Sequence, residues 1–256
     1  MRYHRLKVLR RLPHPDRGFT QGLIADDGTV WESTGLYGQS GIRRYQLGED
    51  RVNVAVAVPP EMFGEGICRV GAHLWQLTWR ERVALCWDPG SLTLLETVRY
   101  NRDGWGICTA GPYVLTSDGS SELVRRDPRT LAPLDVVVVR CSGQRVGGLN
   151  DLAWADGRVW ANVLPRSYLA GIDVTSGEVV DIVDARPATE RHRGDPEAFL
   201  NGITPLPGAP GAGEGGGGGG NAAAEFLLTG KRWRFLYHVR LIEASSRKDP
   251  ARLLTG

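Results

Sequence analysis

Five similar stretches of the chain carry a polar or indole side chain at the same point, and one of the five is acidic. The positions are held by Gln21, Glu65, Trp105, Asn150 and Asn201. Glu65 has a glycine on each side and Phe63 two residues before it, which makes it a candidate for a carboxylate held away from water. Such burial disfavours the charged form and raises the pKa toward neutrality. A carboxyl group of this kind can take up and return a proton, as a general acid-base catalyst must.

The same residues also allow a purely structural interpretation. Glu65 would then be a permanently ionised carboxylate, and the five positions would satisfy one another and ordered water. A position that only packs a core should be apolar in every stretch, whereas this one is polar in four and indole in the fifth. We therefore expect the five side chains to line a cavity.

The five stretches are repeats of one unit whose openings lie 40 to 51 residues apart. They are TQGLIADDGTVWEST (20–34), GEGICRVGAHLWQLT (64–78), GWGICTAGPYVLTSD (104–118), LNDLAWADGRVWANV (149–163) and LNGITPLPG with EFLLTGK (200–231). In each, two β-rich runs flank a turn, and a second strand pair follows in the first four repeats, over 42–56, 83–98, 123–137 and 169–183. Four short strands in 40–50 residues are typical of a β-propeller blade. The sequence predicts an all-β, five-bladed propeller.

The last repeat supplies three strands at most, and the segment LKVLRRL (6–12) has no other partner. We predict that this N-terminal segment is the outer strand of the last blade and closes the ring, with a free N-terminal arm as the alternative. The propeller would span residues 1–243 as one domain. Residues 205–224 are low in complexity and are expected to be a flexible insertion, and residues 244–256 a frayed C-terminal tail.

In a propeller the first strand of each blade faces the axis, so the five opening positions should meet there. The glycines that follow four of them suit a close approach of backbones, and Asp151 follows the fourth opening instead. The ends of the second strands add Trp79, Asp118, Leu164 and Lys231. Lys231 is one of three lysines against 28 arginines, which suggests a need for a compact ammonium beside the channel. Trp79 and Trp105 could form an aromatic pocket near Glu65, whereas Trp31, Trp75 and Trp160 are expected to pack within blades.

Composition excludes several classes of function. The net charge of +2, from 31 basic and 29 acidic residues, gives no case for nucleic acid or an anionic membrane as partner. No apolar run is long enough to span a bilayer, and the N-terminus has no apolar segment typical of a secretory signal. Cys68, Cys86, Cys108 and Cys141 lack metal-site spacing and are expected to be buried free thiols, although disulfides stay open.

At these positions the sequence resembles the plant and bacterial glutaminyl-peptide cyclotransferases, the zinc-independent glutamine cyclotransferase family. The matching segments run in order along the chain: PHPDRGFTQGL (13–23), WESTGLYGQSGIR (31–43), FGEGI (63–67), WQLTW (75–79), GWGI (104–107), SDGS (117–120), LND (149–151), ANV (161–163), LNGI (200–203) and TGKRW (229–233). The resemblance implies a five-bladed propeller that converts the N-terminal glutamine of peptides and proteins to pyroglutamate with release of ammonia. It implies no catalytic metal and no cofactor.

By matching motif, the resemblance assigns the acid-base role to Glu65 and places Phe19 and Gln21 at the site. Trp79 and Trp105 become pocket walls, and Asn150 and Lys231 are carried over as catalytic residues. Asn201 and Leu164 are further expected substrate contacts. Candidate donors to a developing oxyanion are Lys231, Asn150 and Gln21. The chain departs from the family at two places. ANV is followed by Leu164 rather than by Trp, so the expected pocket wall is smaller there. LNDLA replaces LNELE.

Two other functions compete with this interpretation. Gln21, Glu65, Asn150 and Asn201 could hold Ca²⁺ on the axis, either as a structural ion or in a calcium-dependent hydrolase. The propeller could instead be a non-catalytic module that binds a peptide or a sugar on an aromatic floor. We expect a monomer. Members of the family commonly occupy the secretory pathway, the periplasm or the extracellular space, but the sequence does not assign a compartment.

Overall fold

The computed structural model describes residues 1–192, 194–206, 224–245 and 250–255, and within them the chain is almost entirely β. Three sheets have four strands each, in the order β2-β3-β4-β5, β6-β7-β8-β9 and β10-β11-β12-β13, and a larger one has the order β16-β17-β18-β19-β1-β22-β21-β20. The strands are β1 (Arg2–Pro13), β2 (Thr20–Asp26), β3 (Thr29–Thr34), β4 (Gly41–Gln46), β5 (Val54–Ala57), β6 (Gly64–Val70), β7 (His73–Thr78), β8 (Val83–Trp87), β9 (Leu94–Arg99), β10 (Ile107–Ala110), β11 (Tyr113–Ser117), β12 (Glu122–Arg126), β13 (Pro133–Val138), β14 (Arg140–Cys141), β15 (Gln144–Arg145), β16 (Leu149–Ala155), β17 (Arg158–Val163), β18 (Tyr168–Ile172), β19 (Val179–Asp184), β20 (Leu200–Pro205), β21 (Glu225–Gly230) and β22 (Phe235–Glu243). Helical structure in the described residues is limited to short segments: α1 (Arg186–Thr189), α2 (Arg252–Thr255) and the 3-10 turns Pro15–Arg17 and Glu190–His192.

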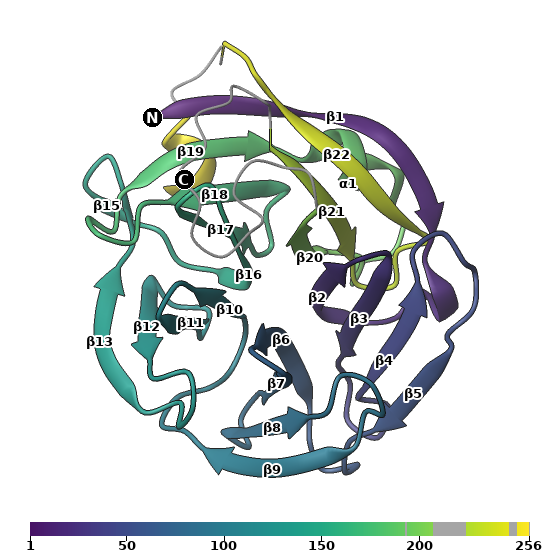
Figure 1. Cartoon of the computed structure of the whole chain (residues 1–256). Helices are drawn as coiled ribbons and strands as arrows, with labels where there is room; N and C mark the ends of the chain where they lie inside the picture. Colours follow the sequence, from purple (N-terminus) through teal and green to yellow (C-terminus); the bar gives the residue numbers. More distant parts are fainter. Residues whose placement is uncertain (193, 207–223, 246–249, 256) are drawn as a thin grey trace.

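The sheets stand around a common centre (Figure 1). The innermost strands contact one another in a closed circle, from β2 to β6, β10, β16, β20 and back to β2. Each predicted repeat opening coincides with one of these inner strands or directly precedes it. Hairpins with a residue pair at positive φ, such as Asp27-Gly28 and Asp156-Gly157, join the first strand to the second, because this turn type matches the twist of the paired strands.

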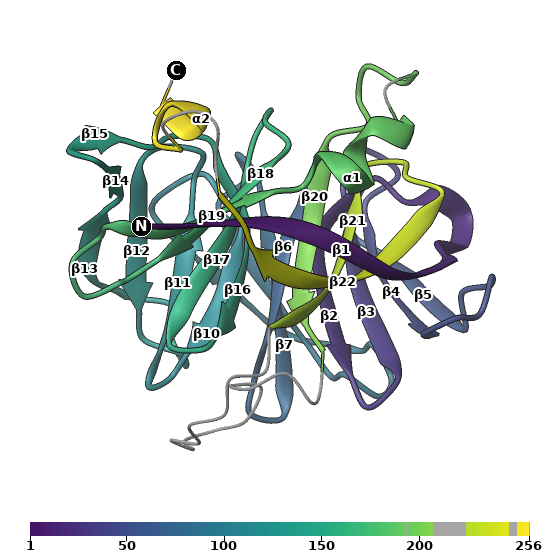
Figure 2. The ribbon, with the colours of Figure 1, turned by 90° about the horizontal axis from the view of Figure 1, so that it is seen from above.

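The N-terminal strand is paired with the last strand of the chain. β1 pairs antiparallel with β22, with Leu6 opposite Leu241, and is therefore the fourth strand beside β20, β21 and β22. The predicted pairing of residues 6–12 with the last repeat is confirmed, and the alternative of a free arm is wrong. The structure adds a feature that the sequence did not predict: residues 2–5 also pair parallel with β19, so that two four-stranded groups merge into one sheet. Figure 2 shows β1 running along the outer surface beside β22.

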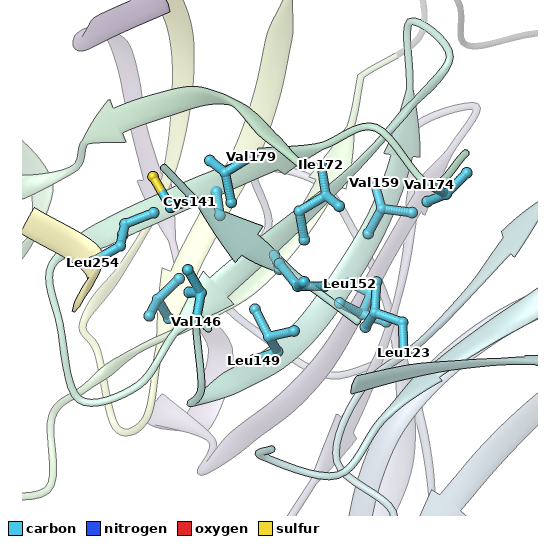
Figure 3. Close-up of a cluster of buried hydrophobic side chains, with 14 of the residues drawn as sticks. Leu123, Cys141, Val146, Leu149, Leu152, Val159, Ile172, Val174, Val179 and Leu254 are labelled. Carbon is cyan, nitrogen blue, oxygen red and sulfur yellow. The ribbon is translucent and has the colours of Figure 1, made fainter. Parts of the chain in front are cut away.

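The core fills the spaces between neighbouring sheets. Figure 3 shows one such cluster, in which Leu123, Leu152 and Ile172 pack together from β12, β16 and β18. Trp31, Trp75 and Trp160 are buried in three other clusters, as predicted. All four cysteines are buried, and Cys68, Cys86 and Cys108 are free thiols, which confirms the thiol prediction for these three.

Two predictions concern the C-terminal part. Most of the expected insertion at 205–224 lies outside the described residues. The expectation of a frayed tail is wrong for residues 250–255, because Ala251 and Leu254 are buried against the cluster that contains Tyr3 and Cys141. Ala251 just before the short helix α2 and Leu254 within it are both apolar, which gives this segment a face to bury. None of the helices in the described residues has the length and apolar character that crossing a membrane requires.

Candidate active site

Each opening side chain lies at an irregularity of its inner strand. The pairing of inner and second strands shifts register between Thr20 and Gly22, Gly64 and Ile67, Leu149 and Leu152, and Leu200 and Ile203. Gln21, Glu65, Asn150 and Asn201 fall within these β-bulges. Trp105 lies two residues before the remaining inner strand, β10. Because a bulge redirects the side chain it carries, the same device turns the opening residue out of the regular pleat in four of the five inner strands.

The openings touch one another around the axis. The Gly66 N–H donates to the Trp105 carbonyl at 2.7 Å, and a Cβ added to Gly66 would lie 2.7 Å from the same oxygen. A Cβ on Gly106 would lie 2.0 Å from the carbonyl oxygen of Asn150. No side chain fits at these two positions, which explains the glycines after the openings and confirms the predicted close approach.

Glu65 is buried at this crowded centre, with 4% of its surface exposed. Burial raises its pKa well above the ordinary 4.5, and the carboxylates of Glu81 and Asp151 add to the rise. The Lys231 ammonium and a hydrogen bond from the Gln21 side chain act in the opposite direction. The residue therefore has the elevated pKa that the sequence analysis expected, together with a cation and an amide donor beside it.

Lys231 follows the end of β21 and is itself largely buried, at 8% exposure. Burial lowers its pKa, and Glu65 and Glu197 partly offset that change. Its Nζ lies 4.9 Å from the centre of the Phe19 ring, a distance typical of a cation–π contact. Phe19, Lys231 and Glu65 thus belong to one cluster.

A chain of amides links two of the openings. The Asn201 Nδ2 donates to the Gln21 Oε1 at 2.7 Å and to the Thr20 carbonyl at 3.0 Å. The Gln21 side chain in turn hydrogen-bonds to Glu65, which lowers the pKa of that carboxyl group. The Oδ1 atoms of Asn150 and Asn201 are buried and have no hydrogen-bond partner within the described part of the chain. Since buried polar atoms normally have partners, these two acceptors are suited to an N–H group of a bound molecule or to water.

Aromatic rings form one wall of the site. Phe63 stands beside Trp79 with ring centres 5.5 Å apart, and its other neighbours are Tyr37 at 5.4 Å and Phe19 at 6.3 Å. Trp105 is half-buried and covers Gly119, where an added Cβ would meet its ring at 2.7 Å. The rings of Phe19, Tyr37, Phe63 and Trp79 thus form one cluster, and Trp79 directly follows β7 as expected.

The structure gives Leu164 and Asn150 no contact with Glu65 among the interactions of the described residues. Leu164 follows the end of β17, as Trp79 follows β7 and Lys231 follows β21, and its N–H donates to the Gly148 carbonyl at 2.8 Å. Asn150 lies at the start of β16, and its backbone oxygen accepts from the Ser117 hydroxyl at 2.8 Å.

Sequence reasoning missed several residues of this region. Phe63 was noted only as a neighbour of Glu65, yet it connects Phe19 to Trp79. Glu81 accepts hydrogen bonds from the Phe63 N–H at 3.1 Å and the Tyr37 hydroxyl at 2.9 Å, and so fixes the aromatic wall. The FGEG segment itself could have indicated Phe63, whereas no pattern around Glu81 marks it.

Asp151 is a second buried acid close to the centre, with no exposed surface. Its Oδ2 accepts from the Ile203 N–H at 2.9 Å, which joins β16 to β20. Burial raises its pKa well above the ordinary 3.8, although three backbone N–H groups oppose the change. The contact explains why an acid replaces glycine at this opening: it bridges two inner strands.

A largely buried ionic network is centred on Glu32, close to the segment that carries Phe19. The carboxylate accepts from the Thr20 hydroxyl at 2.7 Å, from the Tyr45 hydroxyl at 2.9 Å and from the Arg43 guanidinium at 2.8 and 3.0 Å, and His14 Nε2 lies 3.0 Å away. Arg43 and His14 hold the pKa of Glu32 far below its usual range despite burial. The network fixes the segment that carries Phe19 and Gln21.

Among the described residues, no group of three or more His, Cys, Asp or Glu side chains is placed to hold a metal ion. A structural Ca²⁺ held by amide oxygens on the axis stays a prediction. With its buried acid, its partly desolvated lysine and its aromatic wall, the site can perform proton transfer on a small group held between them.

Comparisons with known proteins agree with this chemistry. The sequence matches the family described as glutamine cyclotransferase over residues 1–241. It is 32% identical over 248 residues to a glutaminyl-peptide cyclotransferase from Arabidopsis thaliana, covering 96% of this chain and 74% of that protein. The crystal structure of glutaminyl cyclase from Myxococcus xanthus superposes with a TM-score of 0.84 at 31% identity, over 95% of this chain and 99% of that one. Hydrazine synthase from Kuenenia stuttgartiensis, at 14% identity and a TM-score of 0.50 over 90% of this chain and 64% of that one, is similar in fold alone.

Proposed function

This chain belongs to the glutamine cyclotransferase family and acts as a glutaminyl-peptide cyclotransferase, and we propose that Glu65 is the acid-base group of its reaction. The reaction converts an N-terminal glutaminyl residue to a pyroglutamyl residue and releases ammonia. The observation that carries the assignment is the burial of Glu65 at the axis, with a raised pKa, beside Lys231 and Gln21.

The chemistry is a transfer within the substrate. Its α-amine nitrogen attacks the carbon of its own side-chain amide, so that a C–N bond forms and the ring closes. Glu65, in its ionised form, takes a proton from the attacking amine and gives it to the departing nitrogen, whose bond to carbon breaks to release ammonia. One carboxyl group serves both steps because burial raises its pKa above that of an ordinary glutamate and so makes it a stronger base, and such transfer is worth about 10²–10⁴ in rate.

The remaining residues are proposed to hold the substrate in the folded-back conformation. Phe19, Trp79 and Trp105 supply aromatic surface around the glutamine side chain, and Leu164 a smaller apolar contact. A bound substrate held so that its amine and amide meet gains much of the rate by orientation alone.

Polar groups are proposed to bind the reacting atoms. Lys231 is the strongest candidate to donate to the developing oxyanion, since its ammonium lies in a desolvated site where a donor has most effect. Asn150 and Asn201, whose Oδ1 atoms lack partners, would accept from the substrate's N–H groups, with Gln21 orienting Glu65. All these residues lie on one chain, so the proposed site is complete within a monomer.

We also propose that the ring is a five-bladed β-propeller forming one domain over residues 1–243. The closed circle of inner strands and the four-strand repeat in the sequence support this count. In this interpretation β1 completes the blade of β20, β21 and β22, and its pairing with β19 joins that blade to its neighbour.

Ammonia release from a peptide with N-terminal glutamine tests the assignment of Glu65. We expect Glu65→Gln to lower kcat by about 10² or more while the thermal melt stays cooperative. Glu61→Gln, an exposed glutamate four residues away, is the matched control and should behave as the unmodified protein. Turnover by Glu65→Gln within a few-fold of the unmodified protein would show that another group transfers the proton.

A further inference from the structure

A cavity of about 470 Å³ opens directly beside the site. Its lining includes Arg17, Phe19, Gly35, Gln39, Arg43 and Arg232. Two of these residues also belong to the site. The Phe19 ring contacts the Lys231 ammonium, and a Cβ added to Gly35 would lie 3.0 Å from the Gln21 Cγ. The cavity is therefore separated from the glutamine-binding residues by no more than one ring and one glycine.

The cavity wall holds an unusual concentration of backbone strain. Asp16, Arg17, Leu36 and Arg232 all line it, and all four have positive φ, at 54°, 45°, 86° and 59°. Each such conformation costs a non-glycine residue free energy and persists only where the surroundings impose it. Strained residues collect at ligand clamps, and three separate segments of the chain contribute to this one.

The polar groups of the wall include both donors and acceptors. Arg43 and Arg232 line the cavity and pair with Glu32 and Glu197, with N–O distances of 2.8 Å in both pairs, so their charges are compensated. Asp16 and Asp195 offer acceptors, and Gln39 offers both a donor and an acceptor. A peptide main chain likewise presents both N–H and C=O groups. A single small ion would match only half of this lining.

We propose that this cavity is a subsite for the main chain of the residues that follow the N-terminal glutamine of the substrate. The proposal rests on the cyclotransferase function stated above. The glutamine itself lies at Glu65, and the peptide leaves the site past Phe19 and Gly35 into the cavity. A space of this size takes a ligand of drug-like dimensions, which corresponds to a few residues. The enzyme thereby selects peptides over glutamine derivatives that lack a following chain.

The test compares substrates of increasing length: glutaminamide, Gln-Ala-amide, Gln-Ala-Ala-amide and Gln-Ala-Ala-Ala-amide. We expect kcat/KM for ammonia release to rise about tenfold from the shortest to the longest, as two or so net main-chain hydrogen bonds would produce. Gln39→Trp, which places an indole in the cavity, should abolish the rise. Gln46→Trp is the matched control, because Gln46 is equally exposed on the same sheet but lines a different groove, and it should keep the rise.

The outcomes separate the subsite from the function. Equal kcat/KM at all lengths, with ammonia released, would overturn the subsite and leave the cyclotransferase function intact. A rise that survives Gln39→Trp would also overturn it. Should no substrate release ammonia, the proposed function fails, and dissociation constants of the same four compounds measured by calorimetry then decide the subsite: affinity that grows with length and is lost in Gln39→Trp supports it, and affinity independent of length refutes it.

Discussion

Replacing Glu32 by glutamine should destabilise the protein by about 3–5 kcal/mol, the usual result of removing one partner from a buried ion pair. Glu32 has no exposed surface and Arg43 has 7%, so neither charge can turn to water when the other is lost. The substitution leaves the Arg43 guanidinium without a counter-charge and turns one acceptor oxygen into an NH₂ group. That group would face the donors that now point at Glu32.

The measurement is urea denaturation at pH 7, supported by a thermal melt, in which the same loss corresponds to a fall in Tm of roughly 6–20 °C for a chain of this size. Glu96→Gln is the control, since Glu96 is exposed on β9, and we expect it to change the free energy of unfolding by less than about 0.5 kcal/mol. The double variant Glu32→Gln/Arg43→Met removes both charges and should recover most of the lost stability.

The pH dependence supplies an independent check. The pKa of Glu32 is lowered in the folded protein, so its contribution is present above its unfolded pKa near 4.5 and is lost as the pH falls below it. The Glu32→Gln variant should therefore lose less stability between pH 5 and pH 3 than the unmodified protein does. A variant within about 1 kcal/mol of the unmodified protein at pH 7, or a double variant less stable than the single one, would refute the argument.

Three further changes are expected to have separate effects. The stability of Asp151→Asn relative to the unmodified protein should be greater at pH 8 than at pH 4. The reason is that the raised pKa of Asp151 makes the unmodified protein lose stability as the pH rises. Urea denaturation at both pH values measures this difference in the free energy of unfolding, and a difference independent of pH contradicts the argument. Trp105→Ala should raise KM for a Gln-peptide about tenfold with a smaller change in kcat, since the ring supplies binding surface; an unchanged KM in steady-state kinetics would remove Trp105 from the pocket. Deletion of residues 1–12 removes the strand between β22 and β19 and should abolish the cooperative melt seen by calorimetry, whereas a melt at an unaltered temperature would mean that ring closure contributes little.

The repeat could be predicted from the sequence, because each of its units uses the same turn and the same alternation of buried residues. Equivalent positions of a repeat around an axis must meet, so Gln21, Glu65 and Asn201 could be brought together without coordinates. The pairing of residues 6–12 with the last repeat followed from counting strands in that repeat. These inferences depend on periodicity, which a single sequence displays.

The remaining features depend on contacts between units, which no local pattern records. The β-bulges at Glu65 and Asn150 arise where inner strands crowd the axis, and nothing in their spacing distinguishes a bulge from a regular strand. Glu81 reaches the aromatic wall from a loop after β7, through a hydrogen bond to Tyr37 that spans 44 residues of sequence. The ion network of Glu32 likewise joins His14, which follows β1, to Arg43 on β4.

The position of β1 also bears on how the chain is made. Its main partner, β22, is synthesised long after β1 itself, so residues 2–13 must wait before that pairing can form. The short parallel ladder between residues 2–5 and β19 becomes available some fifty residues earlier and gives the strand a first pairing partner. Because Phe19 and Gln21 follow β1 after a short turn, a nascent chain that stalls before β22 carries an unfinished reaction centre, and enzymatic competence requires translation through β22.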